Sequence, residues 1–253
     1  MDVVRAIEDN AADLLMAMGA AGGGSQRADA RATWTIGGSP LDYHNAVVRA
    51  SDTGVIAESL AELKKHDVPG TWHVGPSMQI DRTALTAAGF VAAGNEPGMA
   101  VRISELTAPR DVPGLELVRI TDDETMATWE ATLGQGFGEG EREARWAAAT
   151  FRKLGYGDPW RHYLGVLDGR PVGTATVFLG AGVAGLYFVM TVPSVRRRGI
   201  GAAITYGVLR DSGPEYAVLG SSAAGRPVYE ALGFREYCTI DFYEWTGSST
   251  SAG

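Results

Sequence analysis

The feature that most constrains the fold is a change of pattern near residue 195. Residues 186–192 are apolar, aromatic or β-branched, which is typical of a buried strand. From Ile200 onward, apolar side chains recur at helical spacing. The intervening turn, residues 193–199, contains three consecutive arginines and a glycine. The sequence therefore predicts a strand that leads through a basic turn into the N-terminus of a helix.

This turn has the properties of a phosphate site. The first N–H groups of a helix have no partner within the helix and lie at the positive end of its dipole. Gly199 and Gly201 let the backbone approach an anion closely, and residues 196–198 can add charge-assisted arginine contacts. The alternative is that arginines at such a junction are only solvated.

A second segment follows one strand later. Residues 216–220 are typical of a strand, and residues 221–232 indicate a short helix that carries Tyr229 and ends in Gly233-Phe234. The same ending, Gly89-Phe90, closes an expected helix in the N-terminal half. This echo indicates a weak internal repeat, with a common left-handed helix cap as the equal alternative.

Together the two C-terminal segments resemble the GCN5-related N-acetyltransferase (GNAT) superfamily. Its coenzyme A pyrophosphate loop reads R/Q-x-x-G-x-G/A, which Arg196, Gly199 and Gly201 match, and the Tyr229 segment is similar to its coenzyme-side helix. The resemblance implies an acyl-CoA-dependent N-acyltransferase, with acetyl-CoA as the first expectation for the donor and a small-molecule amine as acceptor. The cofactor-binding residues implied are Met190, Thr191, Val192, Arg196, Arg197, Arg198, Gly199, Ile200, Gly201, Ala202 and Tyr229.

The resemblance also implies a catalytic residue. Tyr229 matches the tyrosine that protonates the departing thiolate, and the reference pKa of a phenol, near 10, suits that leaving group. The alternative is a half-buried tyrosine that only packs. The base is not identified, because residues 184–191 contain no carboxylate; Thr191 or Tyr187 could order a water, although a structural role is favoured for both.

Acceptor specificity is expected in residues 134–143, which the resemblance places beside the acceptor. Four glycines predict a mobile segment, and Glu139, Glu141 and Glu143 would favour a cationic amine. An equally good interpretation is that Glu141 and Glu143 favour the N-terminus of the next helix through its dipole.

The order of elements indicates an α/β protein with a mixed sheet, a GNAT fold in the C-terminal half and a degenerate GNAT-like N-terminal half. The expected boundaries are 1–104 for the degenerate domain, 105–114 for a linker, 115–246 for the catalytic domain and 247–253 for a disordered tail. In the N-terminal half, the turn that corresponds to the phosphate loop is Arg49–Gly54. It has one glycine, and Asp52 would repel a pyrophosphate. We therefore expect coenzyme A to bind the C-terminal half alone.

Composition excludes several function classes. The formal net charge of −8 disfavours nucleic acid as a partner, and Cys238 is a lone cysteine, so no internal disulfide forms. Four scattered histidines show no metal-ligand spacing, so no metal is expected. The sequence lacks a signal peptide pattern and a membrane span, which predicts a cytoplasmic protein; its oligomeric state is left open.

Two alternatives to the leading function remain at this point. One is an acyltransferase with an unusual acyl or aminoacyl donor. The other is a coenzyme A-binding regulatory module without catalysis, which the missing carboxylate in residues 184–191 suggests and the presence of Tyr229 argues against.

Overall fold

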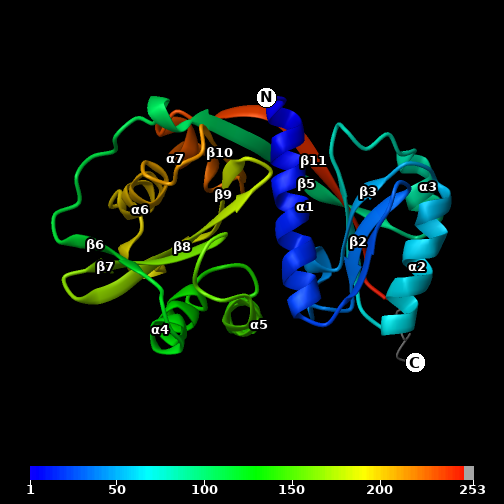
Figure 1. The fold of residues 1–253 in the computed structure, drawn as a ribbon, viewed down its shortest axis with the longest axis horizontal. Coiled ribbons are helices and arrows are strands. Elements are labelled where there is room, and N and C mark those ends of the chain that lie inside the picture. The colour runs from blue at the N-terminus through cyan, green and yellow to red at the C-terminus, as the bar shows by residue number, and fades with distance from the viewer. Residues whose placement is uncertain (248–253) are drawn as a thin grey trace. The chain divides into compact units, whose positions relative to one another are not determined.

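The structure is a computed structural model that describes residues 1–247 (Figure 1). The expected tail lies at 247–253, and its residues 248–253 are outside this range. No helix among residues 1–247 is long and apolar enough to cross a membrane. The chain forms two compact units, each built from two stretches of sequence. Unit 1 comprises Met1–Asn10 and Gly98–Tyr237, and unit 2 comprises Ala11–Pro97 and the described residues from Cys238 onward.

Unit 1 contains the predicted phosphate turn. Its strands are β6 (Leu115–Arg119), β7 (Trp160–Leu167), β8 (Arg170–Gly180), β9 (Val183–Thr191) and β10 (Tyr216–Gly220), and its helices are α4 (Asp123–Leu133), α5 (Glu141–Leu154), α6 (Ile200–Leu209) and α7 (Arg226–Ala231). The strand order is β5-β10-β9-β8-β7-β6, where the contribution of β5 (Val91–Arg102) is its last part, Gly98–Arg102.

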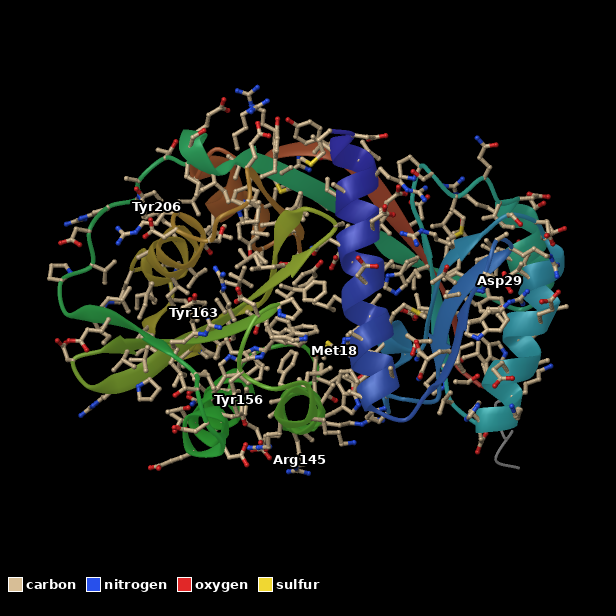
Figure 2. All side chains as sticks on the ribbon, in the orientation of Figure 1. Met18, Asp29, Arg145, Tyr156, Tyr163 and Tyr206 are labelled. Carbon is tan, nitrogen blue, oxygen red and sulfur yellow. The ribbon has the colours of Figure 1, made fainter. Side chains whose placement is uncertain are left out.

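Helices cover both faces of the unit 1 sheet, and for this reason β8 is buried almost throughout. On one face, Ala175 and Val177 pack in the same core cluster as Ile204 and Val208 of α6. Alternate residues point the other way. On that face Phe178 contacts Trp160, and Trp129 of α4 meets Phe151 of α5 edge-on. Side chains fill the space around these elements, while Arg145 on α5 is exposed (Figure 2).

Unit 2 has a smaller sheet in the order β1-β2-β3-β4-β11. Its elements are β1 (Ser25–Ala28), β2 (Ala32–Ile36), β3 (Ala46–Ala50), α2 (Gly54–His66), β4 (Gly70–Val74), α3 (Arg82–Ala87) and the end of β11 (Arg235–Trp245). Helix α1 (Val3–Ala21) begins in unit 1 and ends in unit 2. The core of unit 2 gathers around Trp72, Leu63 and Phe90.

Each half of the sequence supplies a strand to the unit built mainly from the other half. The N-terminal half of the sequence supplies Gly98–Arg102 to the sheet of unit 1, antiparallel to β10. The C-terminal end of the chain supplies Asp241–Trp245 to the sheet of unit 2, antiparallel to β4. The compact units therefore differ from a division of the sequence at residues 105–114. Strand β5 runs from Val91 to Arg102, and only its last part, Gly98–Arg102, belongs to unit 1.

The internal repeat is visible in the geometry. The order strand, helix, parallel strand, short helix occurs as β3-α2-β4-α3 and again as β9-α6-β10-α7. Both short helices end alike: Ala88 and Leu232 have φ −83°, and the glycines that follow have φ 94° and 98°. In each case the next phenylalanine N–H bonds to the carbonyl five residues earlier, that of Leu85 or Tyr229. The second half of the chain thus repeats the element order and helix ending of the first.

Candidate functional site

The predicted phosphate turn begins α6 as expected. After β9 ends at Thr191, one turn of 3-10 helix covers Pro193–Val195, and α6 starts at Ile200. Two residues of this turn have left-handed backbone, Arg197 with φ 61° and Gly199 with φ 82°. A glycine avoids the strain of that conformation, whereas an arginine there is uncommon.

The backbone of this turn presents a row of donors. The N–H groups of residues 197–202 make no hydrogen bond to any residue in the described part of the chain. The first bonded N–H is that of Ala203, which donates to the carbonyl oxygen of Gly199 at 3.0 Å. Successive unpaired amides at a helix N-terminus form a concave anion site. We call residues 197–202 the amide cradle.

The strand before the cradle has a free edge. Strands β9 and β10 pair in parallel only at Ala184 with Ala217 and Gly185 with Val218. Within the described residues, nothing on β10 pairs with residues 186–191 of β9. The expected cofactor strand, Met190 to Val192, therefore has backbone groups available on that edge, although the Val192 N–H itself donates to Val172 of β8.

A bulge interrupts β9 just before these residues. Its pairing with β8 steps from Thr174–Met190 to Thr176–Tyr187, so β9 contains one extra residue. Phe188 lies in this bulge with φ 50°, and its carbonyl oxygen accepts a 2.8 Å hydrogen bond from the buried hydroxyl of Thr174. Nothing in the sequence pattern signalled the bulge or the role of Thr174.

The three arginines have different environments. Arg197 and Arg198 are exposed, and neither forms an ion pair with any residue among 1–247. Arg196 points elsewhere: its Nε donates to the carbonyl oxygen of Thr191 at 2.9 Å, and one Nη donates to that of Gly136 at 3.1 Å. Two of its three nitrogens are thus bound to the backbone, which differs from the phosphate contact expected for this side chain.

Gly201 and Tyr229 lie on neighbouring helices. A Cβ added at Gly201, in the first turn of α6, would lie 3.2 Å from the Thr191 hydroxyl, so this turn packs closely against the end of β9. Tyr229 is half-buried on α7, which contacts α6, and its ring meets Phe234 edge-on at 5.8 Å. The packing role considered for Tyr229 is therefore present, and it leaves part of the side chain exposed.

The carboxylates of residues 134–143 do not form an open acidic patch. Glu139 pairs with Arg142 at 2.8 Å, and Glu141 is exposed beside Arg145 at 4.0 Å. Glu143 is buried and accepts a hydrogen bond from the backbone N–H of Glu139. Glu141 and Glu143 stand in the first turn of α5, the arrangement that their interpretation as dipole partners requires.

Tyr187 has a structural partner. Its hydroxyl donates to Oδ1 of Asn10 at 2.7 Å. Asn10 is fully buried on α1, and its amide donates to the carbonyl oxygens of Phe178 and Gly180. Sequence reasoning missed Asn10, because a single asparagine in an amphipathic helix carries no signal of its partner.

His162 lies on β7, and its side chain is fully buried. Its Nδ1 lies 3.0 Å from the Thr176 hydroxyl, and its Nε2 has no partner among the described residues. Burial, assisted by the charge of Arg119, lowers the pKa of His162 to about 3. The ring is therefore neutral at physiological pH and packs against Phe151, with ring centroids 4.1 Å apart.

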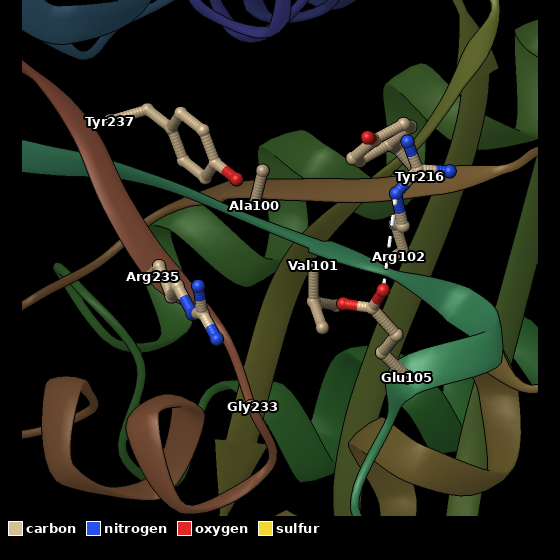
Figure 3. Close-up of a pocket in the computed structure, with 8 residues that line it drawn as sticks. All are labelled: Ala100, Val101, Arg102, Glu105, Tyr216, Gly233, Arg235 and Tyr237. Atoms are coloured by element: carbon tan, nitrogen blue, oxygen red, sulfur yellow. Dashed lines mark ion pairs between the residues drawn. The ribbon is translucent and has the colours of Figure 1, made fainter.

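A pocket of unit 1 lies away from the amide cradle (Figure 3). Among its lining residues are Arg102, Tyr216, Arg235 and Tyr237. Arg102 is already engaged, because it pairs with Glu215 and lies 4.7 Å from the Tyr216 ring centroid. Tyr216 begins β10, which runs parallel to β9, so the pocket lies toward the opposite end of the sheet from the amide cradle. None of the expected cofactor residues lines it.

No group of histidine, cysteine, aspartate and glutamate side chains suited to a metal ion is found among residues 1–247. The sole cysteine, Cys238, is buried and free.

Comparisons with known proteins agree with this geometry. Residues 124–234 match the model of the acetyltransferase (GNAT) family. A GCN5-related N-acetyltransferase from Kribbella flavida is similar in structure, with a TM-score of 0.70 and 18% identity over 95% of this chain and 97% of that one. A conserved protein of unknown function from Staphylococcus epidermidis gives a TM-score of 0.67 and 14% identity, covering 88% of this chain and 94% of its own.

A tandem GNAT protein from the clavulanic acid biosynthesis pathway is also similar, with a TM-score of 0.57 and 18% identity over 78% of this chain and 70% of that one. No curated protein matches the sequence. At these identities the structural likeness establishes the fold, and the family match covers the segment that holds the amide cradle and Tyr229. The chain therefore has the GNAT fold, and its residues 124–234 match the GNAT acetyltransferase family.

Proposed function

We propose that this protein transfers an acyl group from acyl-CoA, with acetyl-CoA as the donor, to the amine of a small molecule. The observation that carries the proposal is the amide cradle: residues 197–202 offer successive N–H groups at a helix N-terminus, with left-handed backbone at Arg197 and Gly199. A pyrophosphate is the group that such a row of donors fits.

The remaining parts of the donor site follow from this placement. The cradle would bind the pyrophosphate of coenzyme A through its backbone, and Arg197 and Arg198 would add charge from the same turn. The free edge of β9 at Met190 and Thr191 would accept the amide groups of the pantetheine arm. The thioester would then lie along β9, near the bulge at Phe188.

The reaction proposed is direct attack. A neutral amine attacks the thioester carbonyl, a C–N bond forms, and the C–S bond breaks as the electron pair leaves with sulfur. Tyr229 donates its phenolic proton to the departing thiolate. The amine loses its proton to water, because β9 contains no carboxylate and the Tyr187 hydroxyl already donates to Asn10.

The test combines binding with turnover. Calorimetric titration with coenzyme A should give one site per chain, and free thiol should appear when the protein meets acetyl-CoA and a panel of amines, aminoglycosides and amino acids. Binding without thiol release for any acyl donor would instead support a non-catalytic coenzyme A module. Release only with longer acyl or aminoacyl thioesters would change the donor, and no binding at all would refute the proposal.

A further inference from the structure

The loop between α4 and α5, residues 134–140, has four glycines and yet is fastened at several points. Glycine-rich backbone loses much conformational freedom when it is held in one arrangement. The structure shows contacts from the segment after β9, from α5 and from the bulge of β9. We call residues 134–140 the fastened loop.

The first fastening is Arg196. Its planar guanidinium donates from two nitrogens to two carbonyl oxygens, those of Thr191 on β9 and Gly136 in the loop. The close approach depends on glycine: a Cβ at residue 136 would lie 2.8 Å from the Arg196 Nη and 3.1 Å from Pro193. A single side chain thus joins the end of the proposed cofactor strand to this loop.

The second fastening is Glu143, which is 1% exposed. Its Oε2 accepts the Glu139 N–H at 3.0 Å, and a Cβ at Gly138, where φ is 45°, would lie 1.7 Å from that oxygen. The third is Phe137, whose ring centroid lies 5.4 Å from that of Phe188 in the bulge. The loop therefore runs beside β9 over the stretch where the proposed thioester lies.

We propose that Arg196 is a positioning residue, which holds the fastened loop against the end of β9 so that the acceptor amine meets an ordered wall beside the thioester. The inference rests on the proposed function, because the thioester position comes from it. It gives Arg196 a role separate from that of Arg197 and Arg198, which carry charge without contacts of this kind.

The physical reason lies in the geometry of the fork. Two parallel N–H donors fix two carbonyl oxygens relative to each other, whereas a lysine keeps the charge but has one nitrogen. A direct role in phosphate binding depends mainly on charge, so lysine would preserve much of it. A positioning role and a phosphate-binding role thus predict different results for Arg196→Lys.

The experiment compares the parent with Arg196→Ala, Arg196→Lys and the control Arg197→Ala. Hydrogen exchange without ligand should show the amides of residues 137–140 exchanging at least about tenfold faster in both Arg196 variants, and at the parental rate in Arg197→Ala. With an active amine, the acceptor KM should rise about tenfold or kcat should fall by a similar factor in the Arg196 variants. The dissociation constant of coenzyme A should stay within about threefold of the parent.

Gly136→Ala provides a second route if an Arg196 variant fails to fold. Its new methyl group displaces the Arg196 Nη from the loop, so faster exchange of residues 137–140 is expected here too. Unchanged loop exchange in all these variants overturns the proposal. The same follows if Arg196→Ala loses coenzyme A affinity and Arg196→Lys restores it, because Arg196 is then a phosphate ligand. A parent that binds no coenzyme A refutes the proposed function, while the exchange data still decide whether Arg196 holds the loop.

Discussion

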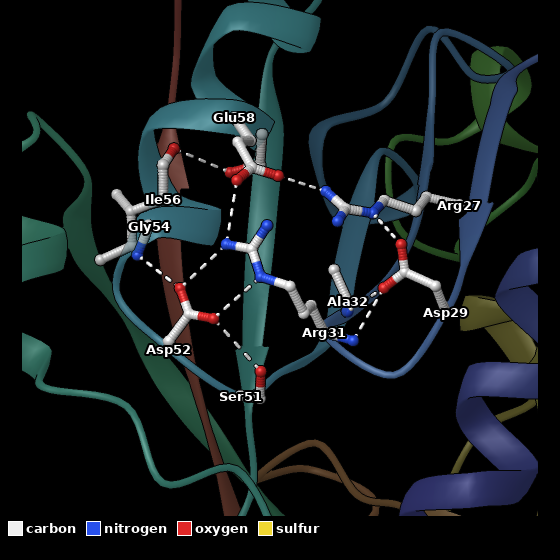
Figure 4. Close-up of polar contacts among 10 residues, drawn as sticks. Arg27, Asp29, Arg31, Ala32, Ser51, Asp52, Gly54, Ile56 and Glu58 are labelled. Atoms are coloured by element: carbon white, nitrogen blue, oxygen red, sulfur yellow. Dashed lines mark hydrogen bonds and ion pairs between the residues drawn. The ribbon is translucent and has the colours of Figure 1, made fainter.

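Two helix N-termini in this chain have the same local setting and opposite chemistry. Helices α6 and α2 each follow a strand and precede a parallel one. At α6 the preceding turn is basic and its amides are unpaired. At α2 the carboxylate of Asp52 accepts the N–H of Gly54 at 2.9 Å (Figure 4). Unit 2 thus supplies its own anion where unit 1 leaves room for one.

The charges around α2 are also balanced among themselves. Arg31 binds Asp52 through two nitrogens at 3.1 Å and also pairs with Glu58, which in turn pairs with Arg27 (Figure 4). An entering pyrophosphate would have to displace a carboxylate and repel others. The candidate acid has no counterpart here, because Leu85 stands where the second copy of the repeat has Tyr229. Unit 1 thus has the features of an anion site, whereas unit 2 has the same order of elements without them.

The largest expected effect is at Tyr229, whose equivalent in the first copy of the repeat is Leu85. Tyr229→Phe keeps the ring against Phe234 and removes the phenolic proton, so kcat should fall by roughly 10² to 10⁴-fold if chemistry limits turnover. Coenzyme A affinity should change little. Steady-state kinetics with an active amine and calorimetry measure the two quantities. If the variant turns over at the parental rate, Tyr229 is a packing residue like Leu85.

The next effect concerns the approach of phosphate to the first turn of α6. Gly201→Val adds a side chain that would lie against Thr191 and crowd the amide cradle, so coenzyme A affinity should fall about tenfold or more. Gly54→Val, in the first turn of α2, is the comparison variant and should leave coenzyme A affinity unchanged. Circular dichroism confirms folding of both variants. Equal loss of affinity in both would show that the two helix N-termini do not differ as proposed.

The difference between local and long-range signals decides how much the sequence could predict. The strand, turn and helix over residues 186–209 are encoded by neighbouring residues, and the structure confirms them. The sheet pairing of β5 is not local: this strand contains Gly94, Pro97 and Gly98, which are typical of turns, and its sheet partner lies more than 100 residues away. The partner of Arg196 is similarly distant, since Gly136 is 60 residues earlier.

The same limit applies to the charged side chains of both units, whose partners the sequence does not show. The sequence shows that Asp52 is present in the turn before α2, and the structure adds that this carboxylate caps Gly54 and binds Arg31. The structure also shows that Glu143 fastens the loop of residues 134–140, which its position in an acidic segment of the sequence did not indicate. Residue type predicted charge at both places, whereas burial and pairing depend on the fold.

A smaller effect is expected for the exposed arginines of the cradle turn. Arg197→Ala and Arg198→Ala should each weaken coenzyme A binding about three- to tenfold, because exposed charges contribute modestly and are screened by salt. The loss should shrink between 0.05 and about 0.5 M NaCl. Arg49→Ala, in the corresponding strand of unit 2, is the control and should have no effect on binding. A loss for Arg49→Ala equal to that of the cradle arginines would contradict the assignment to unit 1.

The smallest effect is expected at the α2 N-terminus itself. Hydrogen bonds from Arg31 hold the pKa of Asp52 below its ordinary value, and those from Arg27 lower the pKa of Asp29 to about 2. A carboxyl with a depressed folded pKa stabilises the fold fully above its unfolded pKa, near 4, and loses that contribution as the pH falls through its folded pKa. Asp52→Asn should therefore lower Tm slightly at pH 7, and the difference from the parent should diminish as the pH falls below about 4.

Scanning calorimetry of parent and Asp52→Asn across this pH range measures the difference, and added salt should reduce it because the groups are exposed. Coenzyme A affinity and kcat should match those of the parent, since the carboxylate serves only the N-terminus of α2. A second coenzyme A site appearing in Asp52→Asn would show that this carboxylate alone keeps unit 2 from binding the cofactor. That result would make the difference between the two helix N-termini a matter of one charge, whereas the surrounding arginine and carboxylate pairs predict that it takes more than one.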